Sequence, residues 1–104
     1  MRTQVVPATD PEAPLECLLT REDGQRRQPA IDELFARLDR QEQTPTGTRF
    51  VFKGEPSSLW ESVNAFAAEE AVCCPFYDFT ITETGHGVEL DVSLPPQRVE
   101  VEGL

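Results

Sequence analysis

The chain has 104 residues, which is long enough for one domain and too short for two. Of these residues 38% are hydrophobic and six are Phe, which is enough for one packed core. Nineteen acidic residues against nine basic ones give a formal net charge of −10. A surface this acidic repels phosphate backbones and anionic lipid headgroups, so no direct binding to nucleic acid or membranes is expected. No stretch approaches the roughly 20 apolar residues that cross a bilayer. Because the first residues also lack the apolar core of a signal peptide, we expect a cytoplasmic protein.

The N-terminal part of the chain predicts a flexible arm, a strand and a helix. Residues 1–12 contain two Pro and no sustained hydrophobic period, which indicates an arm without regular structure. From Leu15 apolar and polar residues alternate, which predicts a strand with Cys17 on its more apolar side. A polar, Gly-containing run weakens any helix before Pro29, after which an apolar stripe at helical spacing predicts the first helix, to about Arg40.

The middle of the chain predicts a second strand and the central helix. Residues 49–53 alternate with both Phe on one side, as in a half-buried strand. Ser58 and Glu61 have the spacing of a capping box, so the helix should begin there. Pro75 lacks a backbone donor and disfavours helical geometry in the residue before it, so the helix should end near Cys73.

The C-terminal part predicts a β-hairpin. Residues 77–82 and 88–94 both alternate apolar and polar side chains, and a Gly-rich turn joins them. The predicted order is β-α-β-α-β-β, in one domain over residues 13–96 followed by an acidic tail over residues 97–104. Strands with one apolar face suit a sheet that helices cover on one side only. We therefore expect an α+β fold, a two-layer sandwich of a four-stranded sheet with two helices on one face.

The chemistry-bearing residues argue against an enzyme. The only His, His86, lies between two Gly in the hairpin turn, where no catalytic partner is expected. There is no phosphate-binding loop and no pair of Cys-x-x-Cys motifs. Two adjacent cysteines, Cys73 and Cys74, are more informative, and Cys17 can lie near them if the helix covers the sheet. Three thiolates without a His favour soft, thiophilic cations over Mg²⁺ or Ca²⁺.

Local charge disfavours a redox role for these thiols. The C-terminus of a helix carries partial negative charge, which Glu69, Glu70 and Asp78 increase, whereas reactive thiols use helix N-termini or cationic neighbours. Consecutive helical residues point about 100° apart, so we interpret Glu69 and Glu70 as a solvated flank and not as a catalytic pair. A soft metal can still displace thiol protons, so a binding role stays open.

The region around the cysteines resembles a known family. The pattern E-x-x-C-C-P-F-x-x-F-x-[IL], here Glu70 to Ile81, is similar to a module of small bacterial proteins that also occurs fused behind MerR-type, mercury-resistance-like regulators. The similarity spans roughly residues 13–96, with Cys17-Leu-Leu-Thr20 at the place of a Cys-x-Leu-Thr strand, although this chain shows no helix-turn-helix. The resemblance implies a heavy-metal context and would give metal-ligand roles to Cys73 and Cys74, with Cys17 as the third candidate.

Two functions follow as hypotheses. The first is an accessory domain that binds or senses a soft heavy metal, such as Hg²⁺ or trivalent arsenic, through Cys73, Cys74 and Cys17. It requires no cofactor besides that ion, for which Zn²⁺ could stand in. The second is a non-catalytic protein-interaction or dimerisation module, with a second copy or another protein as partner, in which the cysteines are small buried hydrophobes of the core.

Overall fold

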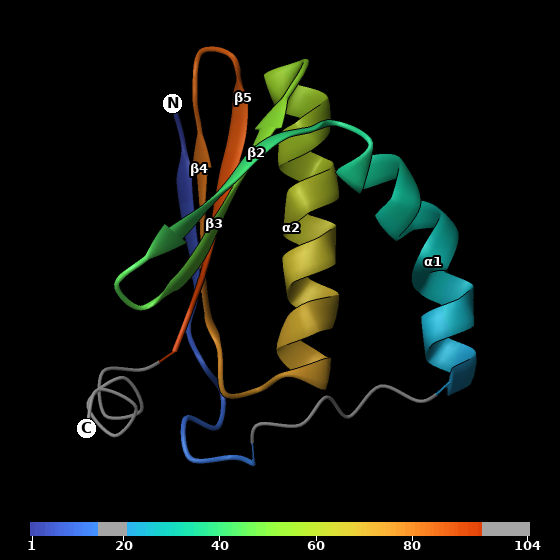
Figure 1. Cartoon of the computed structure of the whole chain (residues 1–104), viewed down its shortest axis with the longest axis vertical. Helices are drawn as coiled ribbons and strands as arrows, with labels where there is room; N and C mark the ends of the chain where they lie inside the picture. The colour runs from blue at the N-terminus through green and yellow to red at the C-terminus, as the bar shows by residue number, and fades with distance from the viewer. Residues whose placement is uncertain (15–20, 95–104) are drawn as a thin grey trace.

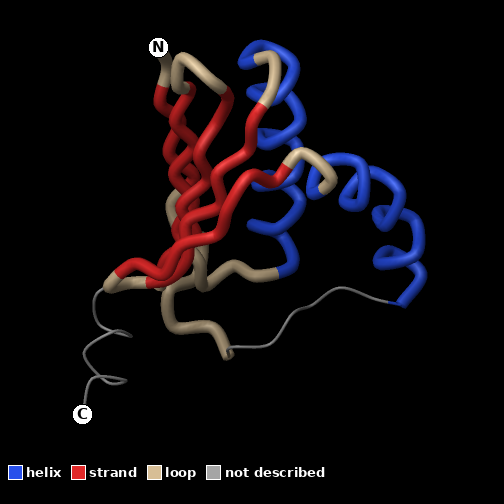
Figure 2. Tube along the Cα trace, turned by 45° about the horizontal axis from the view of Figure 1, so that its top comes forward, coloured by secondary structure: helices blue, strands red, loops and turns tan. Residues whose placement is uncertain are grey.

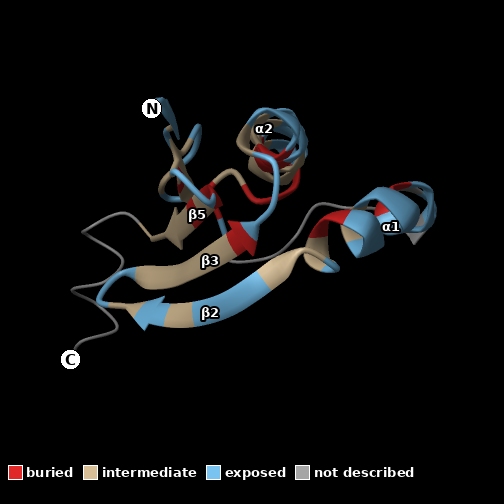
Figure 3. Cartoon of the chain, turned by 90° about the horizontal axis from the view of Figure 1, so that it is seen from above, coloured by how far each residue is buried: buried red, intermediate tan, exposed pale blue. Residues whose placement is uncertain are grey.

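The computed structural model describes residues 1–14 and 21–94. The elements follow the chain as β1 (Thr3–Val6), α1 (Arg21–Phe35), β2 (Leu38–Thr44), β3 (Gly47–Lys53), α2 (Pro56–Cys73), β4 (Asp78–Glu83) and β5 (Gly87–Ser93) (Figure 1). The strands form one antiparallel sheet in the order β1-β4-β5-β3-β2. Both helices lie on the same side of this sheet, and α2 packs directly against β4 and β5 (Figures 1 and 3).

The α+β class is confirmed, but the sheet has five strands where the sequence predicts four. Two of the five, β1 and β2, were not predicted. The strand predicted from Leu15 onward and the predicted tail over residues 97–104 lie outside the described residues. None of the helices in the described ranges has the length and apolar character needed to span a bilayer.

The first correction concerns the N-terminal arm, part of which is the edge strand β1. Thr3 pairs with Thr82 and Val6 pairs with Phe79, so the segment extends the sheet beyond β4. Its β-branched residues suit extended backbone, but four residues are too few to show a hydrophobic period. Pairing with the exposed edge of β4 therefore decides its structure, and no local sequence signal announces it.

The second correction concerns α1, which begins and ends earlier than predicted. It starts at Arg21 and includes the polar run, with Pro29 inside the helix, and it ends at Phe35. Leu38, which fits the helical stripe, instead begins β2 opposite Phe52. β2 has the polar, charged sequence of an exposed edge strand, so its pattern gives little evidence of a strand. In Figure 2, a short loop joins α1 to β2 at the edge of the sheet, and the axis of α1 diverges from that of α2.

The central helix α2 has the predicted C-terminus and a different N-terminus. It begins at Pro56, two residues before the predicted cap, because Glu55 is the N-cap residue. The Glu55 carboxylate accepts hydrogen bonds from the backbone N–H groups of Ser58 and Ser57 at 2.7 and 3.1 Å, and these bonds lower the pKa of Glu55. Pro56 suits the first helical position. The helix ends at Cys73 as predicted, with Cys74 as its C-cap.

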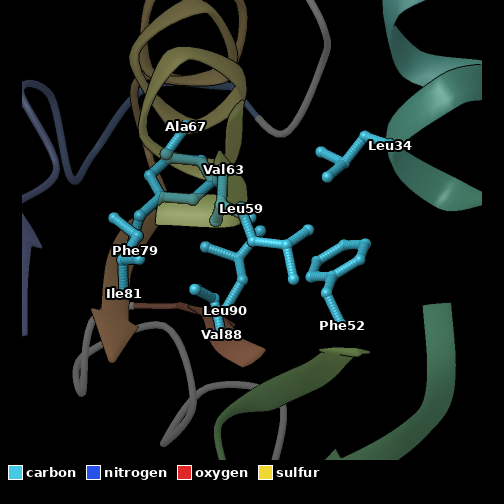
Figure 4. Packing of buried hydrophobic residues seen from close by; sticks show 9 residues of the cluster. All are labelled: Leu34, Phe52, Leu59, Val63, Ala67, Phe79, Ile81, Val88 and Leu90. Carbon is cyan, nitrogen blue, oxygen red and sulfur yellow. The ribbon is translucent and has the colours of Figure 1, made fainter. Parts of the chain in front are cut away.

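The β4-β5 hairpin and the main core agree with the hydrophobic pattern. The hairpin pairs Asp78 with Ser93 and Glu83 with Val88. The main core joins α2 to the inner faces of β3, β4 and β5, and its buried members are Leu34, Phe52, Leu59, Val63, Ala67, Phe79, Ile81, Val88 and Leu90 (Figure 4). The end of α1 joins this core through the ring of Phe35, which lies 5.3–5.6 Å from three Phe rings of β3 and α2.

Candidate thiol site

The two adjacent cysteines lie in a second, smaller core at the end of α2. Cys73 is 6% exposed and Cys74 is 8% exposed, and both belong to one buried cluster with Ala13 and Phe76. The chain turns here because Pro75 ends the helix, and the N–H of Tyr77 donates to the carbonyl of Cys74 at 3.2 Å. The turn and the N-terminal segment thus enclose both thiols in one place.

A buried arginine contacts this cluster. Arg27 comes from α1 and is only 4% exposed. Its Nε donates to Glu69 at 2.5 Å and its Nη2 donates to Glu70 at 2.9 Å. Its Nη1 reaches the sulfur of Cys73 across 3.7 Å. The planar guanidinium therefore bridges two carboxylates and a thiol, a geometry that its fork of donors allows.

The charges in this Arg27 cluster hold the guanidinium in its protonated form. Burial acts to lower the pKa of Arg27, but the hydrogen bonds and charges of Glu70 and Glu69 outweigh it and raise the pKa above its usual value. Its Cζ also lies 5.8 Å from the ring centroid of Phe66. A permanent positive charge therefore lies against the Cys73 thiol.

The predicted ligands are partly described by the structure. Cys73 and Cys74 share one cluster, whereas Cys17 lies outside the described residues. Within residues 1–14 and 21–94 there is no group of three or more His, Cys, Asp or Glu side chains placed to hold a metal ion. The described part of the chain therefore offers two adjacent thiols and no third ligand of these types beside them.

Sequence reasoning missed Arg27 and its contacts with the two glutamates. Arg27 precedes Ile31 by four positions and Leu34 by seven, so it lies on the same helical face as the apolar stripe. That spacing could have placed it inward. Glu69 is exposed, as expected for a solvated flank, and Glu70 is partly exposed, but both also bind the same buried guanidinium. A long side chain from another helix can bridge two consecutive residues that do not face each other.

A cavity of about 500 Å³ with a mixed polar and apolar lining adjoins the thiol cluster. It lies between the inner face of the sheet and the second half of α2, and its apolar walls are Phe50, Phe66, Tyr77, Phe79, Val92 and Leu94. The rest of the lining is Glu70 and residues 43–48 of the β2-β3 hairpin, most of which are polar. Tyr77 and Leu94 pack against the thiol cluster as well, so cavity and cluster share a wall.

The fold and the site together define a two-layer α+β domain with a buried arginine, two carboxylates and two adjacent thiols at the end of its central helix. Comparisons of the chain with protein-family models, with curated proteins and with solved structures find no match. The function must therefore be argued from the chemistry of these side chains.

Proposed function

We propose that this protein binds a soft, thiophilic ion, Hg²⁺ or trivalent arsenic, through Cys73 and Cys74, with Cys17 as the third ligand. The observation that carries the proposal is the packing of both cysteines into one buried cluster. Thiolates select soft ions over Mg²⁺ and Ca²⁺, and Hg²⁺ accepts two thiolates in a linear arrangement. The likeness of the Cys-Cys-Pro-Phe region to the module fused behind mercury-resistance-like regulators supports the same chemistry.

The surroundings of the thiols support ion binding further. Binding of Hg²⁺ by thiols releases their protons and leaves thiolate charge on the sulfurs. Arg27, whose Nη1 is 3.7 Å from the Cys73 sulfur, offsets part of that charge. The apolar neighbours Ala13 and Phe76 limit access of water and of competing hard ions.

The test is a titration of the fully reduced protein with Hg²⁺. We expect one equivalent to bind, with thiolate-to-metal absorption in the ultraviolet and release of protons. Cys73→Ser with Cys74→Ser should abolish the signal, and Cys17→Ser should weaken it if Cys17 is the third ligand. Because any accessible thiol binds mercury, affinity is compared with that of a two-thiol peptide. An affinity equal to that of the peptide would contradict the proposal.

A second candidate function is an interaction or dimerisation module in which the cysteines serve as packing residues. Their burial beside Ala13 and Phe76 favours this alternative, since small buried cysteines are common in cores. The exposed apolar side chains of Val5 and Val72 offer contact surface for a partner. In this case Cys73→Ala should lower the melting temperature. The mass of the wild-type protein in sedimentation experiments should rise with its concentration, which would report dimerisation. Its affinity for Hg²⁺ should equal that of the two-thiol peptide.

A further inference from the structure

The cavity beside the β2-β3 hairpin has the features of a small-molecule site that does not involve the thiols. Its volume of about 500 Å³ lies within the range of roughly 300–1,000 Å³ that is typical of ligand pockets. The lining includes the carboxylate of Glu70, and neither Cys73 nor Cys74 is among its described residues. It also includes four aromatic side chains, Phe50, Phe66, Tyr77 and Phe79. The cavity can therefore hold a ligand whether or not a metal ion is bound to the cysteines.

The aromatic side chains of the cavity are positioned by contacts with other rings. Phe50 of β3 and Phe66 of α2 both pack edge-to-face against Phe35, with ring centroids 5.6 and 5.5 Å from its centroid. The rings of Tyr77 and Phe79 pack against each other with their centroids 6.2 Å apart. Phe50, Phe66 and Tyr77 are only partly buried, so part of each side chain is accessible to a ligand. The faces of such rings carry partial negative charge and attract cations.

The charge of the cavity favours a cationic ligand. Glu70 is the only residue with a charged side chain among the described residues of the lining. Arg27 bonds to Oε1 of Glu70 and also to Glu69, so one positive charge is shared by two carboxylates and one negative charge remains. The net charge of −10 on the whole chain attracts cations and repels anions in addition. An anion would therefore be repelled both at long range and by the lining itself.

We infer that this cavity binds an organic cation with an apolar body, such as a quaternary ammonium compound that carries an aromatic ring. The apolar body packs among the aromatic side chains, and the cationic group lies near Glu70 and the faces of the rings. A neutral apolar molecule of the same shape would gain nothing from the carboxylate. The inference goes beyond the proposed function, because the site uses none of the cysteines.

The experiment compares benzyltrimethylammonium with neopentylbenzene, the neutral molecule of the same shape in which carbon replaces nitrogen. Both are titrated into the full, reduced chain, and binding is followed by the amide chemical shifts of residues 43–48. Glu70→Gln removes the charge from the cavity. Its matched control is Glu69→Gln, because Glu69 bonds to the same guanidinium but is not among the described residues of the lining.

A second pair of variants tests whether the probes bind in the cavity. Thr48→Trp fills the cavity from the inner face of β3. Its matched control is Thr80→Trp on β4, because Thr80 lies between the buried residues Phe79 and Ile81 and so faces the opposite side of the sheet. Circular dichroism and urea denaturation check that each variant is folded.

We expect the wild type to bind the cation about 10-fold more tightly than the neutral molecule. Glu70→Gln should lower the affinity for the cation about 5-fold and leave the affinity for the neutral molecule unchanged, whereas Glu69→Gln should change either affinity by about 2-fold at most. Thr48→Trp should abolish the binding of both probes, and Thr80→Trp should bind them as the wild type does. Replacement of Cys73 and Cys74 by Ser should leave the binding of the cation unchanged, so this test and the Hg²⁺ titration fail independently.

Several results would overturn the inference. Equal or tighter binding of the neutral molecule would exclude a cationic ligand class, and equal losses in Glu70→Gln and Glu69→Gln would attribute the preference to overall charge. Unchanged binding in Thr48→Trp would place the probes outside the cavity. If neither probe binds and Thr48→Trp dissociates a wild-type dimer, the cavity is instead occupied by a second copy of the chain.

Discussion

Replacement of Arg27 by Met tests whether the buried ion pairs hold α1 in place. Met keeps an apolar stem but removes the guanidinium, whose Cζ lies 5.8 Å from the ring centroid of Phe66. The change abolishes the hydrogen bonds to Glu69 and Glu70 and the contact with the sulfur of Cys73. We expect a less stable protein in which the N-terminal turns of α1 exchange their amide hydrogens faster.

The expected magnitude follows from the burial of the partners. A hydrogen bond to a charged group contributes about 1.5–3 kcal/mol when both groups are shielded from water. The side chains of Glu69 and Glu70 are 49% and 24% exposed, so water replaces part of what each loses. Summed over both bonds with this discount, Arg27→Met should lower the free energy of unfolding by about 2 kcal/mol, or the melting temperature by roughly 10 °C.

Arg49→Met is the matched control, measured in parallel by urea denaturation. Arg49 also binds two carboxylates, Asp91 at 2.7 Å and Glu89 at 3.6 Å, but it is 40% exposed on the open face of the sheet. Solvent screens the ion pairs of Arg49, so Arg49→Met should lower the free energy of unfolding much less than Arg27→Met does. Equal losses of stability in the two variants would refute the idea that burial makes the Arg27 cluster important.

Three further outcomes are expected. Glu70→Gln should destabilise the fold more than Glu69→Gln in urea denaturation, because Glu70 is the less exposed partner of the buried guanidinium. Gly87→Ala should cost about 1–3 kcal/mol of unfolding free energy, because its Cβ would lie only 2.0 Å from a backbone oxygen of β3, whereas Gly85→Ala in the same turn meets no atom within 4 Å and should be nearly neutral. The pKa of the Glu55 carboxyl is lowered in the folded protein from its ordinary value of 4.5. The ionised carboxylate therefore stabilises the fold fully at pH values above 4.5, and this contribution is lost as the pH falls through the lowered pKa of the folded state. The difference in urea midpoint between wild type and Glu55→Gln should therefore shrink between about pH 7 and about pH 3.

Local patterns predicted the parts of the fold that local interactions determine. The hairpin and the end of α2 at Cys73 follow from alternation, a Gly-rich turn and Pro75, all within a few residues of the structure they specify. The strands β1 and β2 lie at the two edges of the sheet, where one is too short and the other too polar to show a pattern. The first turns of α1, which the sequence did not predict, contain Arg27, whose partners Glu69 and Glu70 lie on α2. Local helix propensity does not reflect such distant contacts.

The candidate site shows the same division. The adjacent Cys73 and Cys74 are visible in the sequence, and their burial in one cluster agrees with either of the functions that the sequence suggested. The metal reading, the cytoplasmic location and the role of Cys17 stay predictions. The partners of Arg27 became visible only in three dimensions, because they lie more than forty positions away along the chain.

The negative charge around the thiols is partly offset by Arg27, which the sequence did not suggest. Glu69 and Glu70 were expected to add negative charge beside the cysteines, yet both carboxylates are bound to Arg27, which itself reaches Cys73. The third acid, Asp78, accepts a backbone N–H from the N-terminal segment at 2.6 Å. One guanidinium offsets one of the three carboxylate charges, so the negative charge near these sulfurs is smaller than the sequence suggested but is not removed. Burial also limits chemistry at these sulfurs, since Cys73 and Cys74 are only 6% and 8% exposed and a ligand must displace their apolar neighbours.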